Sequence, residues 1–125
     1  MTDHPQDPAK PSRALTILVG FVHDFAAGIW AACTFAIWWL GRGGAPAGVA
    51  AYLFGLKQSF FFIALGCVAV VLLAGVGRTF TYAGTAGLYG EDAEPLRRRM
   101  LWRKHAILMA VFGLGTIWQY LAVYR

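Results

Sequence analysis

Three long apolar stretches, separated by short polar segments, dominate the pattern of hydrophobic and polar positions along the chain. They cover residues 14–40, about 59–77 and 101–124. A membrane helix needs roughly 20 mainly apolar residues to cross a hydrocarbon core of about 30 Å, so each stretch is long enough. Backbone groups cannot stay unpaired in lipid, and alternating strand patterns are absent. The sequence therefore predicts an all-α integral membrane bundle of three transmembrane helices.

The apolar segment 47–56 determines where the second helix begins. It is too short to cross a membrane alone, and Lys57 ends it. We expect it to extend the second helix, with Lys57 snorkelling to the lipid headgroups. A separate segment at 47–56, which would give four helical segments, is the alternative. The predicted helices cover about 14–40, 47–88 and 100–124.

The polar segments outside these helices have simpler interpretations. Residues 1–13 are polar and contain three prolines, which predicts a disordered tail before a bundle formed by residues 14–125. Glycines recur every third residue at Gly84, Gly87 and Gly90. We expect them to mark a bent end of the second helix, because no strand and no GK[ST] motif accompany them as a phosphate loop would require.

Composition and charge narrow the class of protein. The chain of 125 residues is 58% hydrophobic and only 14% charged. Soluble domains are about a quarter charged, so disorder and most soluble enzymes are excluded. The net charge of +5 comes from residues between apolar runs, which argues against nucleic-acid binding. Cys33 and Cys67 both lie inside apolar runs and form no CxxC or CxxCH motif, so neither a disulfide framework nor a covalent haem site is predicted.

The basic residues predict an orientation. In a three-span topology one side of the membrane carries eight of them and the other carries three. The first group is Lys10, Arg13, Arg78, Arg97, Arg98, Arg99, Arg103 and Lys104, and the second is Arg42, Lys57 and Arg125. The positive-inside rule then places the N-terminus in the cytoplasm of a bacterial-type plasma membrane and the C-terminus outside. The run at 97–104 is first a topology signal that contacts anionic headgroups, with a haem-propionate role as the alternative.

Four ionisable residues lie in or at the edge of the spans, where such residues usually mark function or a partner. They are His23, Asp24, Arg78 and His105. His23 is about nine residues, or about 14 Å, beyond the start of the first helix. Arg78 ends the apolar part of the second helix, and His105 begins that of the third. All four are therefore predicted to lie in the cytoplasmic half of the bundle.

Histidines at similar depth on different helices are typical of membrane proteins that bind haem b. Neutral imidazoles of His23 and His105 would ligate the iron from either side. Trp30 follows His23 by seven residues, which places both on one helix face. Gly20 and Ala27 lie close to that face and would leave room for a flat macrocycle. The sequence thus predicts a haem-binding site that includes Trp30.

Anionic haem propionates would need cations near the cytoplasmic surface. Arg78, Arg103 and Lys104 are placed to meet them. Asp24 lies about 100° around the first helix from His23, so we expect it to face a neighbouring helix, with Arg78 or Lys104 as its ion partner.

Each of these residues also has a structural interpretation. His23 and Asp24 can form a hydrogen-bonded pair that holds the bundle together. His105 can be an interfacial residue that follows Arg103 and Lys104. A metal or proton carrier, with Asp24 as the titrating group, is a further alternative.

Three stretches resemble a known group of membrane proteins. FVHDFAAGIWAACTF looks like the first helix of copper-resistance-protein-D-like proteins and of HemJ-type protoporphyrinogen oxidases, with a His, a Trp about seven residues on and small residues. GCVAVVLLAGVGRTFTYAGTAGLYG resembles their middle helix, and LWRKHAILMAVFGLG is similar to a later one. The resemblance implies bound haem b and functional residues at His23 and at Lys104 or His105. HemJ proteins usually have four spans, whereas three are predicted here, so the haem-binding architecture is carried over and the activity is not.

Three functions follow as hypotheses. The first is a haem-b protein that transfers electrons, with a quinone as a candidate partner. The second is an accessory subunit, without its own cofactor, of a larger membrane complex. The third is a HemJ-like porphyrinogen oxidase. In every case we expect a homo-oligomer or a larger complex in the lipid bilayer, because an intramembrane Asp and two His need shielding from lipid.

Overall fold

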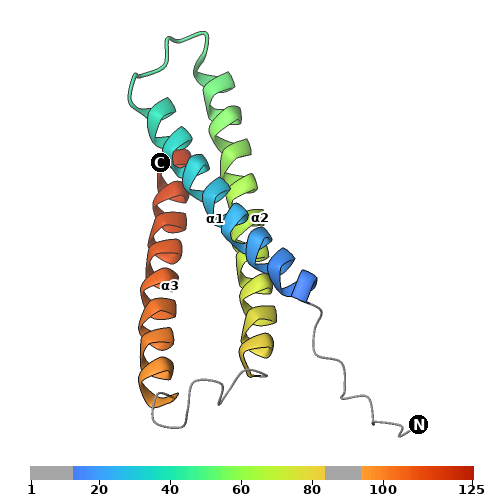
Figure 1. Ribbon diagram of the computed structural model, residues 1–125. Helices are drawn as coiled ribbons and strands as arrows, with labels where there is room; N and C mark the ends of the chain where they lie inside the picture. The colour runs from blue at the N-terminus through green and yellow to red at the C-terminus, as the bar shows by residue number, and fades with distance from the viewer. Residues whose placement is uncertain (1–12, 84–93) are drawn as a thin grey trace, which may run out of the picture.

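The computed structural model describes residues 13–83 and 94–125, and three helices account for most of them (Figure 1). The helices are α1 (Arg13–Gly41), α2 (Ala50–Ala83) and α3 (Glu94–Tyr124), with 29, 34 and 31 residues. Each contains a span that is long and apolar enough to cross a membrane. The described residues contain no strand. The predicted all-α bundle of three membrane-spanning helices is confirmed.

The helix bounds differ from the sequence prediction in two places. α2 begins at Ala50 and continues without a break past Lys57, so the apolar segment 47–56 belongs to the second helix, apart from its first three residues. α3 begins at Glu94, earlier than the predicted start near residue 100. Pro95, in its first turn, has a backbone angle suited to a helix start, and the arginines that follow favour helix. Residues 1–12 and the glycines Gly84, Gly87 and Gly90 lie outside the described residues.

A short turn joins α1 to α2. The Arg42 backbone N–H donates to the Trp39 carbonyl over 3.2 Å, and that of Val49 donates to the Pro46 carbonyl over 2.8 Å. Gly44 has a φ of +62°, a conformation that residues with a Cβ rarely adopt. The glycines and the proline of this segment therefore end α1 and return the chain to the membrane.

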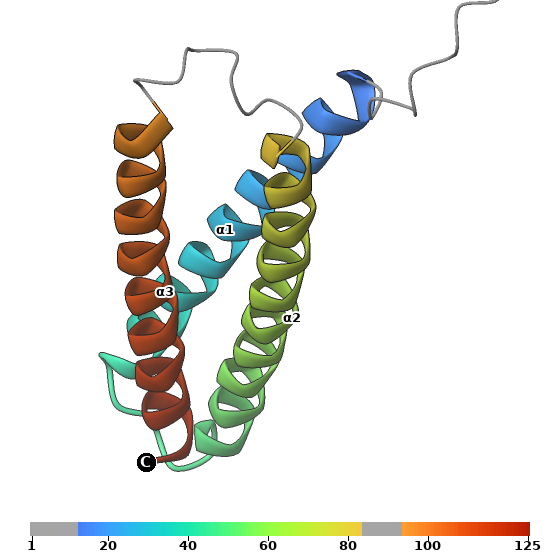
Figure 2. The ribbon, with the colours of Figure 1, turned by 90° about the horizontal axis from the view of Figure 1, so that it is seen from below.

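The helix ends define two ends of the bundle. The basic end contains Arg13, Ala83 and Glu94, and the aromatic end contains Gly41, Ala50 and Tyr124. α1 crosses α2 obliquely and makes most of its contacts with it. Figures 1 and 2 both show the C-terminal half of α1 beside α3, whereas its N-terminal half diverges from α3 toward the basic end.

The buried side chains form two small clusters. The larger joins Ala26, Trp30 and Cys33 of α1 to Ala64 and Cys67 of α2, and the smaller contains Ile37, Phe61 and Val123, one from each helix. Many other large apolar side chains stay exposed, as expected for helices that face lipid on most of their circumference. Between Ala26 and the basic end, α1 has no buried residue.

Candidate functional site: an intramembrane polar cluster

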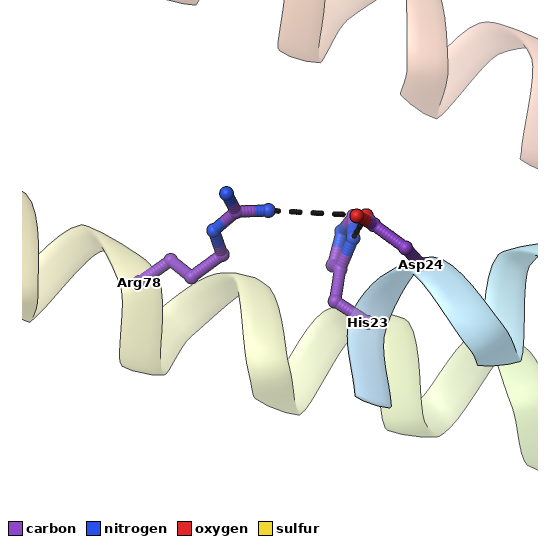
Figure 3. Close-up of polar contacts among 3 residues, drawn as sticks. All are labelled: His23, Asp24 and Arg78. Carbon is purple, nitrogen blue, oxygen red and sulfur yellow. Dashed lines mark hydrogen bonds and ion pairs between the residues drawn. The ribbon is translucent and has the colours of Figure 1, made fainter. Parts of the chain in front are cut away.

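Three side chains from α1 and α2 meet in the N-terminal half of α1 (Figure 3). The imidazole of His23 forms a hydrogen bond through Nδ1 to Oδ1 of Asp24 over 2.9 Å. The same oxygen lies 4.0 Å from Nη1 of Arg78 on α2. Of the two ion partners predicted for Asp24, the structure therefore gives Arg78. We refer to His23, Asp24 and Arg78 as the polar cluster.

The polar cluster faces α3. In Figure 3 its three side chains project toward the side on which the α3 ribbon passes. Lys104 on α3 is close enough to interact electrostatically with Asp24. The second predicted partner thus lies near the carboxylate without pairing with it directly.

The polar cluster is incompletely covered by the chain itself. The side chain of Asp24 is 76% exposed, and those of Arg78 and His23 are 35% and 21% exposed. Asp24 follows one apolar turn of α1 and precedes another, so its surroundings in a bilayer are lipid or a binding partner. A charged group in hydrocarbon is costly, and such groups usually face a partner or a cavity. We therefore expect another molecule or another chain to cover this region.

Asp24 fixes the tautomer of His23. An ionised carboxylate only accepts hydrogen bonds, so Nδ1 of the neutral ring must carry the proton. The lone pair then belongs to Nε2. Metal-ligating histidines show this arrangement, in which one ring nitrogen donates to a carboxylate or carbonyl and the other binds the metal.

His105 shows the same arrangement on α3. Its Nδ1 lies 2.6 Å from the Leu101 carbonyl oxygen, one turn earlier in the helix. A carbonyl also only accepts, so Nδ1 is again the donor and Nε2 carries the lone pair. Both histidines predicted as ligands are therefore oriented by an oxygen acceptor and leave Nε2 available.

Helix geometry places both histidines on the faces turned toward the bundle. His23 is seven residues from buried Trp30, which returns it to the same face of α1. His105 lies within about 60° of Leu101 and Leu108 around the axis of α3. These two leucines are half-buried and mark the packed side of that helix. No hydrogen bond joins the two imidazoles, and ligation of one iron by both stays a prediction.

Trp30 is a helix-packing residue in this structure. Its Nε1 donates to Oγ1 of Thr116 over 3.2 Å, and its ring lies 4.5 Å from that of Phe112. A Cβ added at Gly115 would come within 2.5 Å of the indole. Because α3 covers this ring, the role of Trp30 beside a macrocycle stays a prediction. Gly20, by contrast, has nothing within 4 Å of its Cβ position.

A second polar network, not predicted from the sequence, joins α1 to α3 toward the aromatic end. Nε2 of Gln119 donates to Oγ1 of Thr34, which in turn donates to the Trp30 carbonyl over 2.9 Å. Gln119 is fully buried, and its Oε1 has no partner among the described residues. The four-residue spacing of Trp30 and Thr34 and the three-residue spacing of Thr116 and Gln119 were signals of two polar helix faces.

The contact made by the Lys57 side chain was also not predicted. Its Nζ donates to the Ala122 carbonyl over 3.3 Å, where α3 ends, in place of reaching to headgroups. Helix C-termini carry unpaired carbonyls and a partial negative charge, which explains why an ammonium group is stabilised there. Lys57 therefore links α2 to α3.

Within residues 13–83 and 94–125, no group of three or more His, Cys, Asp or Glu side chains could hold a bare metal ion. Haem needs fewer protein ligands, because the porphyrin supplies four nitrogens and the protein one or two axial groups. Comparison with known protein families, with curated proteins and with solved structures gave no significant match for this chain.

Proposed function

We propose that this chain is a haem-b-binding membrane protein with an electron-transfer role, in which His23 and His105 are the axial ligands. The observation that carries the proposal is that the two imidazoles make the same kind of hydrogen bond. Each has Nδ1 hydrogen-bonded to an oxygen acceptor and Nε2 left for a metal. Bound haem would supply an iron that takes up and releases one electron.

The residues around the ligands fit this cofactor. Asp24 holds His23 in the required tautomer and raises the basicity of its ring. Arg78 and Lys104 are the cations nearest to this region on α2 and α3, and we assign them to the two propionates. The ion pair with Asp24 holds the guanidinium group of Arg78 at the polar cluster.

The cellular setting is part of the proposal. The excess of Lys and Arg at the basic end supports a cytoplasmic location for that end in a bacterial-type plasma membrane. A quinone, which dissolves in the bilayer, is the electron partner that suits a site between spans. The resemblance to the HemJ group supports haem binding, and its oxidase activity would be tested by rescue of a porphyrin-accumulating strain.

An absorption spectrum tests the proposal directly. The protein is purified in mild detergent from haem-replete cells, and spectra are recorded before and after dithionite. We expect a Soret band that shifts on reduction. His23→Ala and His105→Ala should each remove most of the haem, whereas His4→Ala, which alters the third histidine of the chain, should retain it.

The proposal is wrong if the wild-type protein is colourless or if His4→Ala and the two site variants bind haem equally. Circular dichroism and gel filtration of each variant separate loss of haem from loss of the fold.

A second candidate function is an accessory subunit without a cofactor of its own. The 76% exposed side chain of Asp24 favours it, because a partner helix with a hydrogen-bond donor would cover that carboxylate as well as haem would. In this case the wild-type protein is colourless, and Asp24→Asn reduces self-association or co-purification of a membrane partner. His105→Ala leaves that association intact.

A further inference from the structure

The cations at the two ends of the bundle have different surroundings. At the aromatic end, the guanidinium group of Arg42 lies 4.5 Å from the centre of the Trp38 ring, and Lys57 donates to α3. At the basic end, Arg98, Arg99 and Arg103 are exposed, and no ion pair joins them to any described residue. Arg42 and Lys57 therefore have partners within the chain, whereas Arg98, Arg99 and Arg103 form no ion pair with any residue whose side chain the structure describes.

The exposed cations gather on one face of α3. At about 100° per residue, Arg98, Arg99, Trp102 and Arg103 cover a continuous sector of about 140°. The opposite side contains half-buried Leu101 and Leu108 and, further along, buried Gln119, so it faces the bundle. We call the four residues of the outward sector the α3 basic patch. Its members Arg99, Trp102 and Arg103 lie on the side of α3 away from Leu101, Leu108 and Gln119.

The α3 basic patch lies at the depth of lipid headgroups. About 20 residues separate Lys104 from Tyr124, and they rise about 30 Å, which is the thickness of a hydrocarbon core. With Tyr120 and Tyr124 in one interface, Trp102 is in the other. Its side chain is 78% exposed, as expected for an interfacial aromatic anchor.

Like charges on this face require a counter-anion. Arg99 and Arg103 are four residues apart and therefore neighbours on the helix surface, where like charges destabilise one another. Guanidinium groups bind phosphate through paired hydrogen bonds, and two of them can hold one phosphate. A phosphate at this depth, beside an exposed Trp, belongs to a phospholipid.

We infer that the α3 basic patch is a binding site for an anionic phospholipid, with Arg99 and Arg103 on the phosphate and Trp102 against the upper part of the acyl chains. This site is separate from the proposed haem site and does not depend on it. A lipid bound here would hold α3 at a fixed depth.

Native mass spectrometry of protein released from nanodiscs tests this inference. The nanodiscs contain equal amounts of phosphatidylglycerol and phosphatidylcholine, and the lipid that stays bound is counted. We expect the wild type to retain phosphatidylglycerol preferentially. Arg99→Gln/Arg103→Gln should weaken that preference about 25-fold, because each cation near an anionic surface contributes about fivefold to binding.

The matched control is Arg42→Gln/Arg125→Gln, which removes the same charge at the aromatic end and should keep the preference. Equal retention of both lipids by the wild type, or equal losses in the two double variants, would overturn the inference. The second result would mean that only net charge attracts the lipid. The haem spectrum should be unchanged in the single variant Arg99→Gln, which alters no residue placed near the propionates, so the failure of either proposal can be recognised separately.

Discussion

The two halves of the bundle differ in how they treat polar groups. Toward the aromatic end, Trp30 donates to Thr116, Gln119 donates to Thr34, and Lys57 donates to Ala122, so that the chain provides their partners. In the basic half, Asp24, His105 and the α3 basic patch are exposed. In lipid, unpaired polar groups are costly, so exposed ones indicate binding. We therefore expect the half toward the aromatic end to determine stability, and we propose that the half toward the basic end binds a ligand or partner.

The largest loss of stability should come from filling the contact between α1 and α3 in the half toward the aromatic end. Gly115→Leu places atoms where the Trp30 indole already lies, and overpacking typically costs about 1–3 kcal/mol. We expect α3 to separate from α1, measured as a lower midpoint of thermal unfolding in detergent. Gly113→Leu is the control, because nothing lies within 4 Å of its Cβ position. Equal unfolding midpoints for Gly115→Leu and Gly113→Leu would contradict the stabilising role of this contact.

A smaller effect is expected from the polar network beside that contact. Thr34→Val removes the acceptor of the Gln119 amide and leaves a buried polar group unpaired, at about 0.6–2 kcal/mol. Gln119→Leu removes the whole amide, including the Oε1 that has no partner among the described residues, and should be close to neutral. If Gln119→Leu lowers the unfolding midpoint more than Thr34→Val does, the proposed stabilising role of this network is wrong.

The smallest effect on stability is expected in the half toward the basic end. Asp24→Asn keeps an oxygen acceptor for His23 and removes the charge that faces Arg78. The free energy of unfolding should therefore change by about 0.6 kcal/mol or less. If haem is bound, its reduction potential should rise, because a neutral acceptor makes the His23 ring less basic. Potentiometric titration checks the direction. Arg78→Gln is the comparison variant, since it removes a positive charge from the same cluster and should shift the potential in the opposite direction.

The fold was largely predictable because membrane helices are specified by length and apolarity. The runs over 14–40 and 101–124 contain enough residues to cross a bilayer, and the observed helices include both. The pairing of Asp24 with Arg78 was also among the predictions, since ionisable residues in spans have few available partners. Helix bounds outside the bilayer, such as the start of α3 at Glu94, were less predictable because no hydrocarbon boundary constrains them.

The packing of one helix against another was not predictable from the pattern. Spans are apolar on all sides, so hydrophobic periodicity does not identify the buried face. Val123 is buried and Leu121 is exposed, although both are aliphatic residues of one helix. The contact of Trp30 with Gly115 depends on shape, because a glycine lets an indole approach the backbone. For the candidate site, the sequence indicated His23, His105 and the hydrogen-bonded pair of His23 with Asp24, but not the Leu101 carbonyl that orients the ring of His105.

The contact between Trp30 and Gly115 has a mechanical consequence. Together with the packing of Trp30 on Phe112 and the hydrogen bonds of Trp30 to Thr116 and of Gln119 to Thr34, it joins α1 to α3. The parts of α1 and α3 that bear His23 and His105 lie beyond this contact, toward the basic end. A small change in packing at the Trp30 indole would change the separation of the basic ends of α1 and α3 by a larger amount. This one aromatic ring therefore sets the angle between the two helices.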